Sequence, residues 1–349
     1  MPASKTGLKA TEVERTVTPS KFKQNKKKND MKKYIILATA ALALAACNSE
    51  QENEKVWDGE IRLSSVSISQ LTRAAGQDIQ STLFDSGENV DVFINENTTG
   101  TASTTYTQPL TYTTGTGGSL TAPSPQLFPS SGNGVNIYAV YPSGAASNVN
   151  GTDVAFSVKT DQSTDDNYKA SDLMTGAPAS NPVERTATTI PLVFKHCLTK
   201  INLNIYPGEG FTMDALAGAK VSISGATPNA TFNVKTGAVT SVSSAGAGAP
   251  VIDLGTLNAP GNNPYISGSA IIIPQTIAAG TKFIYITIGV NPATNLVYTL
   301  PTSAATTFEA AKVYTFNITA RMSGLSITSS TITDWVDGGT FTGDAVPAN

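Results

Sequence analysis

One adjacent pair, His196 and Cys197, has the side chains best suited to catalysis or metal binding in this chain. An imidazole and a thiolate can act as base and nucleophile, or ligate a metal ion. Strand-like alternation runs through Phe194, His196 and Leu198, and neighbouring residues of a strand point to opposite faces. We therefore expect His196 to be a partly buried core residue and Cys197 to be a small buried hydrophobe.

The other signals for catalysis or cofactor binding are weak. No G-x-S-x-G motif presents a serine, and no phosphate-binding or dinucleotide-binding fingerprint follows a strand. Asp161, Asp165 and Asp166 could meet a calcium ion, but they lack the spacing and the fixed glycine of an EF-hand loop, so a solvated loop is favoured. We predict a protein that is not an enzyme, with no catalytic residues, no metal site and no cofactor.

The segment "MKKYIILATAALALAACNSE" begins at Met31 and indicates export. Two lysines precede 13 uncharged residues, which are too few to span a bilayer and are typical of a signal peptide. "LAAC" at 44–47 matches the bacterial lipobox, in which the cysteine receives the lipid. We therefore expect a lipoprotein signal peptide over residues 31–46 and a lipid anchor on Cys47.

Residues 1–30 fit poorly in front of a signal peptide, so we interpret them as an artefact of an upstream start. Up to Lys33 the chain has ten basic and three acidic residues out of totals of 23 and 26, so the mature chain keeps 13 and 23, a net charge near −10. Such a protein repels phosphate backbones, and nucleic acid is not expected as a partner. After lipidation only Cys197 remains, which excludes an intramolecular disulfide.

Short strands dominate the rest of the chain. Apolar and β-branched residues alternate in many segments that Gly, Pro, Asn and Ser clusters separate, which predicts an all-β fold of sandwiches. Only 212–218 and 306–312 have the composition of short helices. From Leu192 to Ile205 the alternation changes parity, which predicts a bulge or bend near Thr199 and Lys200. We place a boundary near residue 190, with an N-terminal sandwich over 74–190 and a C-terminal sandwich over 191–349.

The stretch "SISQLTRAAGQD" (67–78) combines a strand-like run with one arginine and small residues after it. Arg73 could be a solvated turn residue, or the bond between Arg73 and Ala74 could be a protease site. A cut there would release residues 47–73, a tether and pro-segment that contains a candidate strand. Its apolar side chains are Ile61, Leu63, Val66, Ile68 and Leu71. Loss of this strand would leave an apolar groove with unpaired backbone groups, which is a template for an incoming strand.

Taken in order, several segments resemble the fimbrillins of the type V pilus, the Mfa-like group of lipoprotein-precursor pilins. They are the lipobox at Cys47, "LTRAAG" (71–76), "NIYAVYP" (136–142), "ASDLMTG" (170–176), "LVFKHCLTKINLNI" (192–205), "AIIIPQTIAAGTKFIYITI" (270–288), "VYTFNITA" (313–320) and "SSTITDWVDGG" (329–339).

The resemblance implies two transthyretin-like β-sandwich domains with Greek-key-type strand order. It also implies passage to the cell outer membrane as a surface lipoprotein, a cut after Arg73 by a trypsin-like or arginine-specific protease, and donor-strand exchange with other fimbrial subunits. The donor is usually C-terminal, which here is 338–349 with Phe341 and Val346 as anchors, although these two differ in parity. The alternative function is a surface lipoprotein or tip adhesin that binds host or dietary glycan; Trp57 and Trp335 are the only tryptophans available to it.

Overall fold

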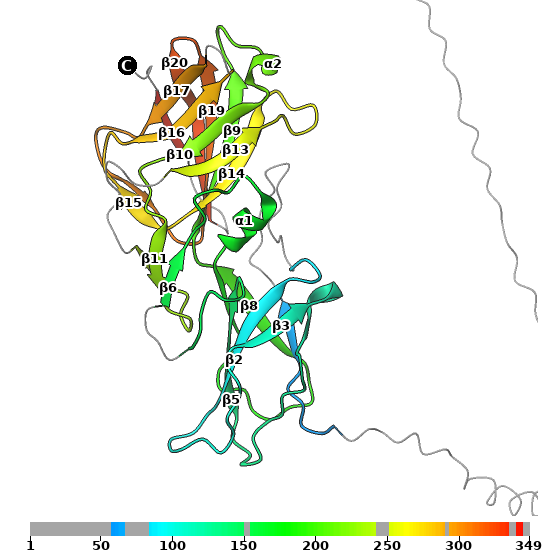
Figure 1. Ribbon diagram of the computed structural model, residues 1–349. Helices are drawn as coiled ribbons and strands as arrows, with labels where there is room; N and C mark the ends of the chain where they lie inside the picture. The colour runs from blue at the N-terminus through cyan, green and yellow to red at the C-terminus, as the bar shows by residue number, and fades with distance from the viewer. Residues whose placement is uncertain are drawn as a thin grey trace, which may run out of the picture. The chain divides into compact units, whose positions relative to one another are not determined.

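The computed structural model describes residues 57–66, 84–149, 154–241, 251–289, 293–334 and 340–344. These residues are mostly β-strands, and the all-β fold class predicted from alternation is confirmed (Figure 1). Two short helices are present among them, α1 (Asp165–Ala170) and α2 (Met213–Leu216). Helix α2 lies inside the expected 212–218 segment. The helix expected at 306–312 is wrong, because Thr306–Phe308 forms a strand and Ala311 has a φ of 56° in the turn that follows.

The N-terminal sheet has seven strands and closes on itself into a barrel. Around the barrel its strands are β1 (Leu63–Val66), β4 (Ser119–Thr121), β3 (Leu110–Thr114), β2 (Asn89–Glu96), β5 (Val135–Tyr141), β7 (Met174–Ala177) and β8 (Ile190–His196). A 3₁₀ turn, η1 (Thr116–Gly118), joins β3 to β4. Every second side chain of a strand points into the barrel. In β3, for example, Leu110, Tyr112 and Thr114 are buried and the residues between them are exposed.

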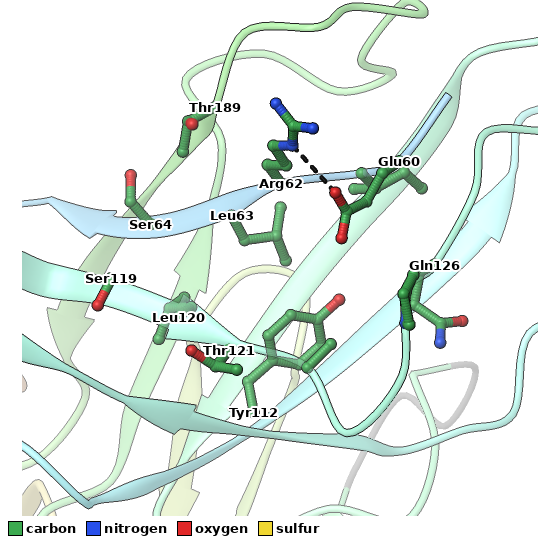
Figure 2. Close-up of a pocket in the computed structure, with 13 residues that line it drawn as sticks. Glu60, Arg62, Leu63, Ser64, Tyr112, Ser119, Leu120, Thr121, Gln126 and Thr189 are labelled. Atoms are coloured by element: carbon green, nitrogen blue, oxygen red, sulfur yellow. Dashed lines mark hydrogen bonds and ion pairs between the residues drawn. The ribbon is translucent and has the colours of Figure 1, made fainter. Parts of the chain in front are cut away.

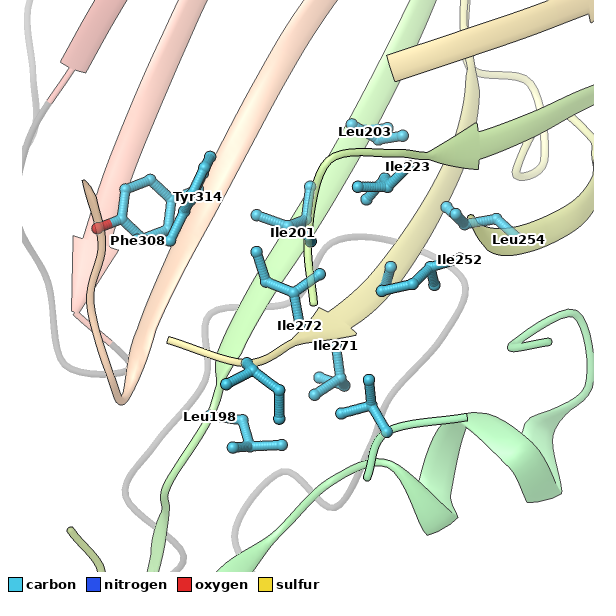
Figure 3. Close-up of a cluster of buried hydrophobic side chains, with 14 of the residues drawn as sticks. Leu198, Ile201, Leu203, Ile223, Ile252, Leu254, Ile271, Ile272, Phe308 and Tyr314 are labelled. Carbon is cyan, nitrogen blue, oxygen red and sulfur yellow. The ribbon is translucent and has the colours of Figure 1, made fainter. Parts of the chain in front are cut away.

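Two larger sheets share one apolar core in the C-terminal part of the chain. One contains β13 (Ile252–Leu257), β10 (Ala219–Ile223), β16 (Lys282–Ile288) and β17 (Thr294–Thr299). The other contains β14 (Ile266–Ile272), β9 (Thr199–Pro207), β19 (Lys312–Arg321), β20 (Gly324–Asp334) and β21 (Thr340–Asp344). Figure 3 shows the shared cluster, in which Leu203 of β9 and Ile223 of β10 lie close together.

Two small sheets complete the described part. One pairs β15 (Gln275–Ile277) with β18 (Thr306–Phe308). The other joins β6 (Val154–Ser157) to β11 (Asn229–Phe232) and β12 (Val239–Ser241).

The chain changes sheets between β8 and β9. Strand β8 pairs with β7 and β1, and β9 pairs with β14 and β19, so the two strands belong to different sheets. Residues 197 and 198 lie between them, two residues before the predicted bend. The division near residue 190 stays a prediction; the hydrogen bonds of β8 join it to the barrel strands.

Candidate functional site

Strand β1 closes the barrel by lying between β4 and β8. It runs parallel to β8 over four residue pairs, from Leu63 opposite Ile190 to Val66 opposite Val193. Its antiparallel pairing with β4 covers two pairs, Leu63 with Leu120 and Ser64 with Ser119. The strand that completes the barrel therefore comes from upstream of Arg73 and has a much shorter seam with β4 than with β8.

Backbone hydrogen bonds extend this docking beyond the strand. The N–H of Ile190 donates to the carbonyl oxygen of Arg62 at 2.8 Å. On the other side the N–H of Ile61 donates to the oxygen of Gln126 at 2.7 Å, and the N–H of Phe128 donates to that of Gly59 at 2.9 Å. The backbone N–H and C=O groups of the even-numbered residues in this segment therefore point toward β8. Those of the odd-numbered residues point toward the β4 side, as expected in a central strand.

The inward face of this segment is buried. Ile61 and Leu63 are each 4% exposed and belong to the apolar cluster of the barrel. Ser65 continues the same parity at 2% exposure, and its hydroxyl donates to the oxygen of Gly118 at 3.1 Å. Sequence reasoning missed Ser65 because a serine in an inward position has no apolar signature; the parity of Ile61 and Leu63 was the available signal.

Trp57 fixes the upstream end of the segment. Its indole Nε1 donates to the oxygen of Glu60 at 3.0 Å, and its ring meets Phe128 edge-on at 6.1 Å between centroids. The guanidinium of Arg185 lies 4.9 Å above the ring centroid, a cation–π contact. Trp57 is therefore used within the protein, on the segment that a cut after Arg73 would release.

A cavity of about 390 Å³ lies beside β1, where the seam with β4 is short. Figure 2 shows Glu60, Arg62 and Leu63 on one side and Leu120, Thr121 and Tyr112 on the other. The Nε of Arg62 lies 3.0 Å from Oε2 of Glu60 at the rim. Burial raises the pKa of Tyr112 well above its ordinary value, and the charge of Glu60 raises it further.

The structure describes only some of the predicted site residues. Ile61 and Leu63 lie in the barrel core, and the backbone of Val66 ends β1. Phe341 lies in β21, at the edge of the C-terminal sheet. The remaining predicted residues lie outside the described residues: Cys47, Ile68, Leu71, Arg73, Ala74 and Val346.

The residues considered first for chemistry have structural partners. Nδ1 of His196 lies 2.8 Å from Oδ1 of Asp172, and both side chains are fully buried. Burial raises the pKa of Cys197 to about 11, so the thiol stays protonated, and its sulfur lies 3.5 Å from the hydroxyl of Thr175. Asp161 accepts hydrogen bonds from Ser163, which hold its pKa below the ordinary value. Asp165 and Asp166 occupy the first turn of α1.

The described residues contain neither a cluster of metal-binding side chains nor a membrane-spanning helix. Within these ranges no three or more His, Cys, Asp or Glu side chains gather as they would around a metal ion. In the same part of the chain no helix is long and apolar enough to cross a membrane.

The chain is similar to known proteins both in sequence and in fold. A family model described as "Fimbrillin-like" matches residues 72–335, and the chain belongs to this family. A second model, for the prokaryotic membrane lipoprotein lipid attachment site, matches residues 31–48, which include Cys47. The resemblance stated from the sequence is confirmed by both.

Individual relatives agree with the family. The chain is similar to the "Putative fimbrium subunit Fim1C" of Bacteroides uniformis, with 29% identity over 329 residues that cover 90% of this chain and 100% of the relative. Two crystal structures, each titled as a "putative cell adhesion protein", share the fold. That from Bacteroides uniformis has a TM-score of 0.57 at 24% identity and covers 80% of this chain and 99% of its own. That from Bacteroides ovatus has a TM-score of 0.60 at 22% identity and covers 80% and 98%.

Proposed function

We propose that this protein is a structural subunit of a cell-surface fimbria that polymerises by donor-strand exchange. It is exported as a lipoprotein anchored through Cys47, and a trypsin-like or arginine-specific protease cuts it between Arg73 and Ala74. The observation that carries the proposal is the position of β1, which completes the barrel and lies upstream of Arg73.

The energetics of β1 favour replacement over simple loss. Full burial of an Ile or Leu side chain is worth about 1.5–3 kcal/mol, so departure of Ile61 and Leu63 removes several kcal/mol from the barrel. It also leaves the facing edges of β4 and β8 without a partner for their N–H and C=O groups. Unpaired strand edges around an apolar groove pair readily with another chain, and strand addition of this kind assembles pilins.

The comparisons support a fimbrial role. The family model begins at residue 72, so β1 lies outside the matched part and Arg73 at its beginning. The relative Fim1C is named as a fimbrium subunit, and we extend that role to this chain. The expected partners are therefore other fimbrial subunits. The expected location is the outer membrane surface before the cut and the fimbria after it.

The C-terminal segment supports the exchange because it forms an edge strand. Strand β21 pairs only with β20 in the described sheet, over four residue pairs with an irregularity between Ile327 and Ser330. An edge strand held by few pairs can leave its sheet at low cost. We propose that the segment 338–349, with Phe341, is lent to a neighbouring subunit.

The alternative, a glycan-binding module, has less support. A cavity of about 440 Å³ is lined in part by Asn95, Glu96, Tyr106 and Gln108, which are types that bind sugars. However, Glu96 already accepts hydrogen bonds from Ser103, Thr104, Ser131 and Asn133, and the hydroxyl of Tyr106 donates to Leu127. Because these polar groups are engaged within the protein, we favour the fimbrial subunit.

Limited proteolysis tests the proposal directly. A soluble form that begins at Asn48 is treated with trace trypsin and followed by intact mass and size exclusion. We expect one early cut after Arg73, followed by loss of residues 48–73 from the folded protein. Arg73→Ala should abolish both, whereas the matched control Arg62→Ala removes an exposed arginine from the same segment and should leave both unchanged. Surface fibres assembled from Arg73→Ala protein in cells would contradict the proposed cut.

A further inference from the structure

The hydroxyl of Tyr112 is buried in the barrel without a hydrogen-bond partner among the described residues. Tyr112 is 1% exposed and lines the cavity beside β1. A buried hydroxyl normally finds a partner, and one left without a partner costs stability. When β1 closes the barrel, one buried hydroxyl beside the proposed exchange groove therefore lacks a hydrogen bond.

Strand register shows which position of β1 lies over this hydroxyl. Thr113 pairs with Thr121, and Leu63 pairs with Leu120. Because Thr114 also pairs with Leu120, the residues Leu63, Leu120 and Thr114 form one row across β1, β4 and β3. Strands β1 and β3 both run antiparallel to β4, so a step of two residues toward the start of each puts Ile61 level with Tyr112, across the cavity that both line. Strand β4 ends at Thr121, and the N–H of Ile61 donates instead to the oxygen of Gln126. In Figure 2 the ring of Tyr112 rises from β3 toward β1, with its hydroxyl directed to the side of Leu63 and Glu60. Ile61 is apolar and offers no acceptor side chain.

We propose that Tyr112 selects the incoming donor strand, and that the matched donor belongs to a different fimbrial subunit. This strand has a hydrogen-bond acceptor side chain at the position of Ile61 and an apolar side chain at that of Leu63. The inference rests on the proposed function, since it concerns the groove that β1 leaves. It also gives exchange a direction, because the donor satisfies a hydroxyl that β1 leaves unpaired.

The C-terminal segment of this chain does not meet both requirements when Phe341 fills the place of Leu63. The place of Ile61 then falls to Gly339 if the segment runs in the direction of β1, or to Gly343 if it runs in the opposite direction. Glycine has no acceptor side chain in either case.

The other registers of the segment also fail. With Val346 in the place of Leu63, the direction of β1 puts Asp344 over Tyr112 but Pro347 at the position of Ser64. Since Arg62 bonds to β8 through its backbone, Ser64 belongs to the same ladder, and proline has no N–H to donate there. The reverse direction puts Ala348 over Tyr112. A shift to Thr340 over Tyr112 puts Thr342, a polar residue, in the place of Leu63.

A double-mutant cycle on the uncut full chain tests whether a side chain at position 61 can accept a hydrogen bond from Tyr112. The variants are Ile61→Thr, Tyr112→Phe and both together, measured by urea unfolding. We expect Tyr112→Phe alone to leave the unfolding midpoint unchanged or raise it. Ile61→Thr should raise the unfolding constant in both backgrounds. The increase should be about threefold to tenfold smaller when Tyr112 is present than in the Tyr112→Phe variant, because threonine supplies an acceptor for the tyrosine hydroxyl. Ile137→Thr, at a buried barrel residue of β5 that does not line the cavity, should show no such coupling.

Peptide binding to trypsin-cut protein tests the choice of partner. The probes are residues 57–68, the same peptide with Ile61→Thr, and residues 338–349. We compare the affinity of the Ile61→Thr peptide with that of the native peptide. This affinity ratio should be threefold to tenfold higher on protein with Tyr112 than on the Tyr112→Phe variant. The 338–349 peptide should bind at least tenfold more weakly than either.

Each contrary result has a distinct meaning. A lower unfolding midpoint for Tyr112→Phe, or no coupling in the cycle, overturns the role of Tyr112 while peptide capture by the groove sustains the proposed function. Equal binding of the 338–349 peptide overturns the different-subunit donor. Failure of every peptide to bind cut protein overturns donor-strand exchange itself, even where the cycle shows the coupling.

Discussion

The barrel and the C-terminal sandwich are both all-β, yet they are completed in different ways. Strand β19, inside the C-terminal sheet, pairs with β9 over nine residue pairs and with β20 over ten. Strand β1, inside the barrel, has four pairs with β8 and two with β4. Both are central strands by topology, but only β1 is short, lies before a candidate cut site and has a cavity along one seam.

The difference indicates which central strand could leave at the lower cost in stability. Removing β19 would take away Val313, Phe316 and Ile318, which lie in the same cluster as the facing sheet. Removing the segment that contains β1 takes away the buried side chains of Ile61 and Leu63, and the other six barrel strands stay paired in the order β4-β3-β2-β5-β7-β8. The proposed exchange is therefore placed at the barrel, where the closing strand contributes less than β19 does to the sandwich.

The largest expected effect comes from breaking the sandwich core. Phe283 is fully buried and stacks on Phe308 with 5.1 Å between ring centroids. Phe283→Ala should lower the free energy of unfolding by about 3–5 kcal/mol, because it removes a large side chain and leaves a cavity. Denaturant unfolding measures this loss. Val251→Ala, at a residue that is 48% exposed, is the control and should change stability by less than about 0.5 kcal/mol.

A smaller and more local effect is expected in the barrel. Leu63→Ala should cost about 2–4 kcal/mol, and the loss should be confined to the docking of β1. By hydrogen exchange, the N–H of Ile190, which donates to Arg62, should lose protection, while amides of β9 and β19 should keep theirs. Cleavage at Arg73 should accelerate as well. Equal loss of protection in both regions would mean that β1 is not an independently detachable strand.

The smallest effect concerns a loop cluster at one end of the barrel and depends on pH. The hydrogen bond from Ser131, with others from Asn133, Thr104 and Ser103, lowers the pKa of Glu96 from 4.5 to about 2. Because the folded-state pKa is the lower one, the stabilisation is present above pH 4.5 and is lost as the pH falls toward 2.

Thermal unfolding of the wild type and of Glu96→Gln tests this assignment. The variant should have the lower midpoint at pH 6, and the two midpoints should converge as the pH approaches 2. A constant difference across that range would show that the charge of Glu96 makes no contribution to barrel stability.

Local pattern was sufficient for much of the fold and failed where two signals competed. The alternation of Leu192, Phe194 and His196 predicts β8, and its break predicts the passage into β9. Helix α1 was missed because 160–166 reads as an acidic loop, although Thr164 caps the helix by accepting from the N–H of Asn167. The segment 306–312 has good helix formers, but its first residues pair with β15 and tertiary pairing overrides their propensity.

The candidate site divides in the same manner. The apolar parity of Ile61 and Leu63 was visible in the sequence, and so was the arginine downstream of them. The partners of the strand were not, since β8 begins at Ile190, more than 120 residues further along the chain. The alignment of Ile61 with Tyr112 depends on the registers of β1 with β4 and of β4 with β3, and no local pattern records a register between distant strands.

By itself the sequence determined what is local: the signal peptide, the lipobox at Cys47, the strand periodicity and the family, because each depends on residue types at short spacings. Only the tertiary structure decided that residues 63–66 close a barrel between β4 and β8, and that the hydroxyl of Tyr112 has no hydrogen-bond partner among the described residues. These are long-range pairings, and their free energy comes from surfaces that meet only after the chain has folded.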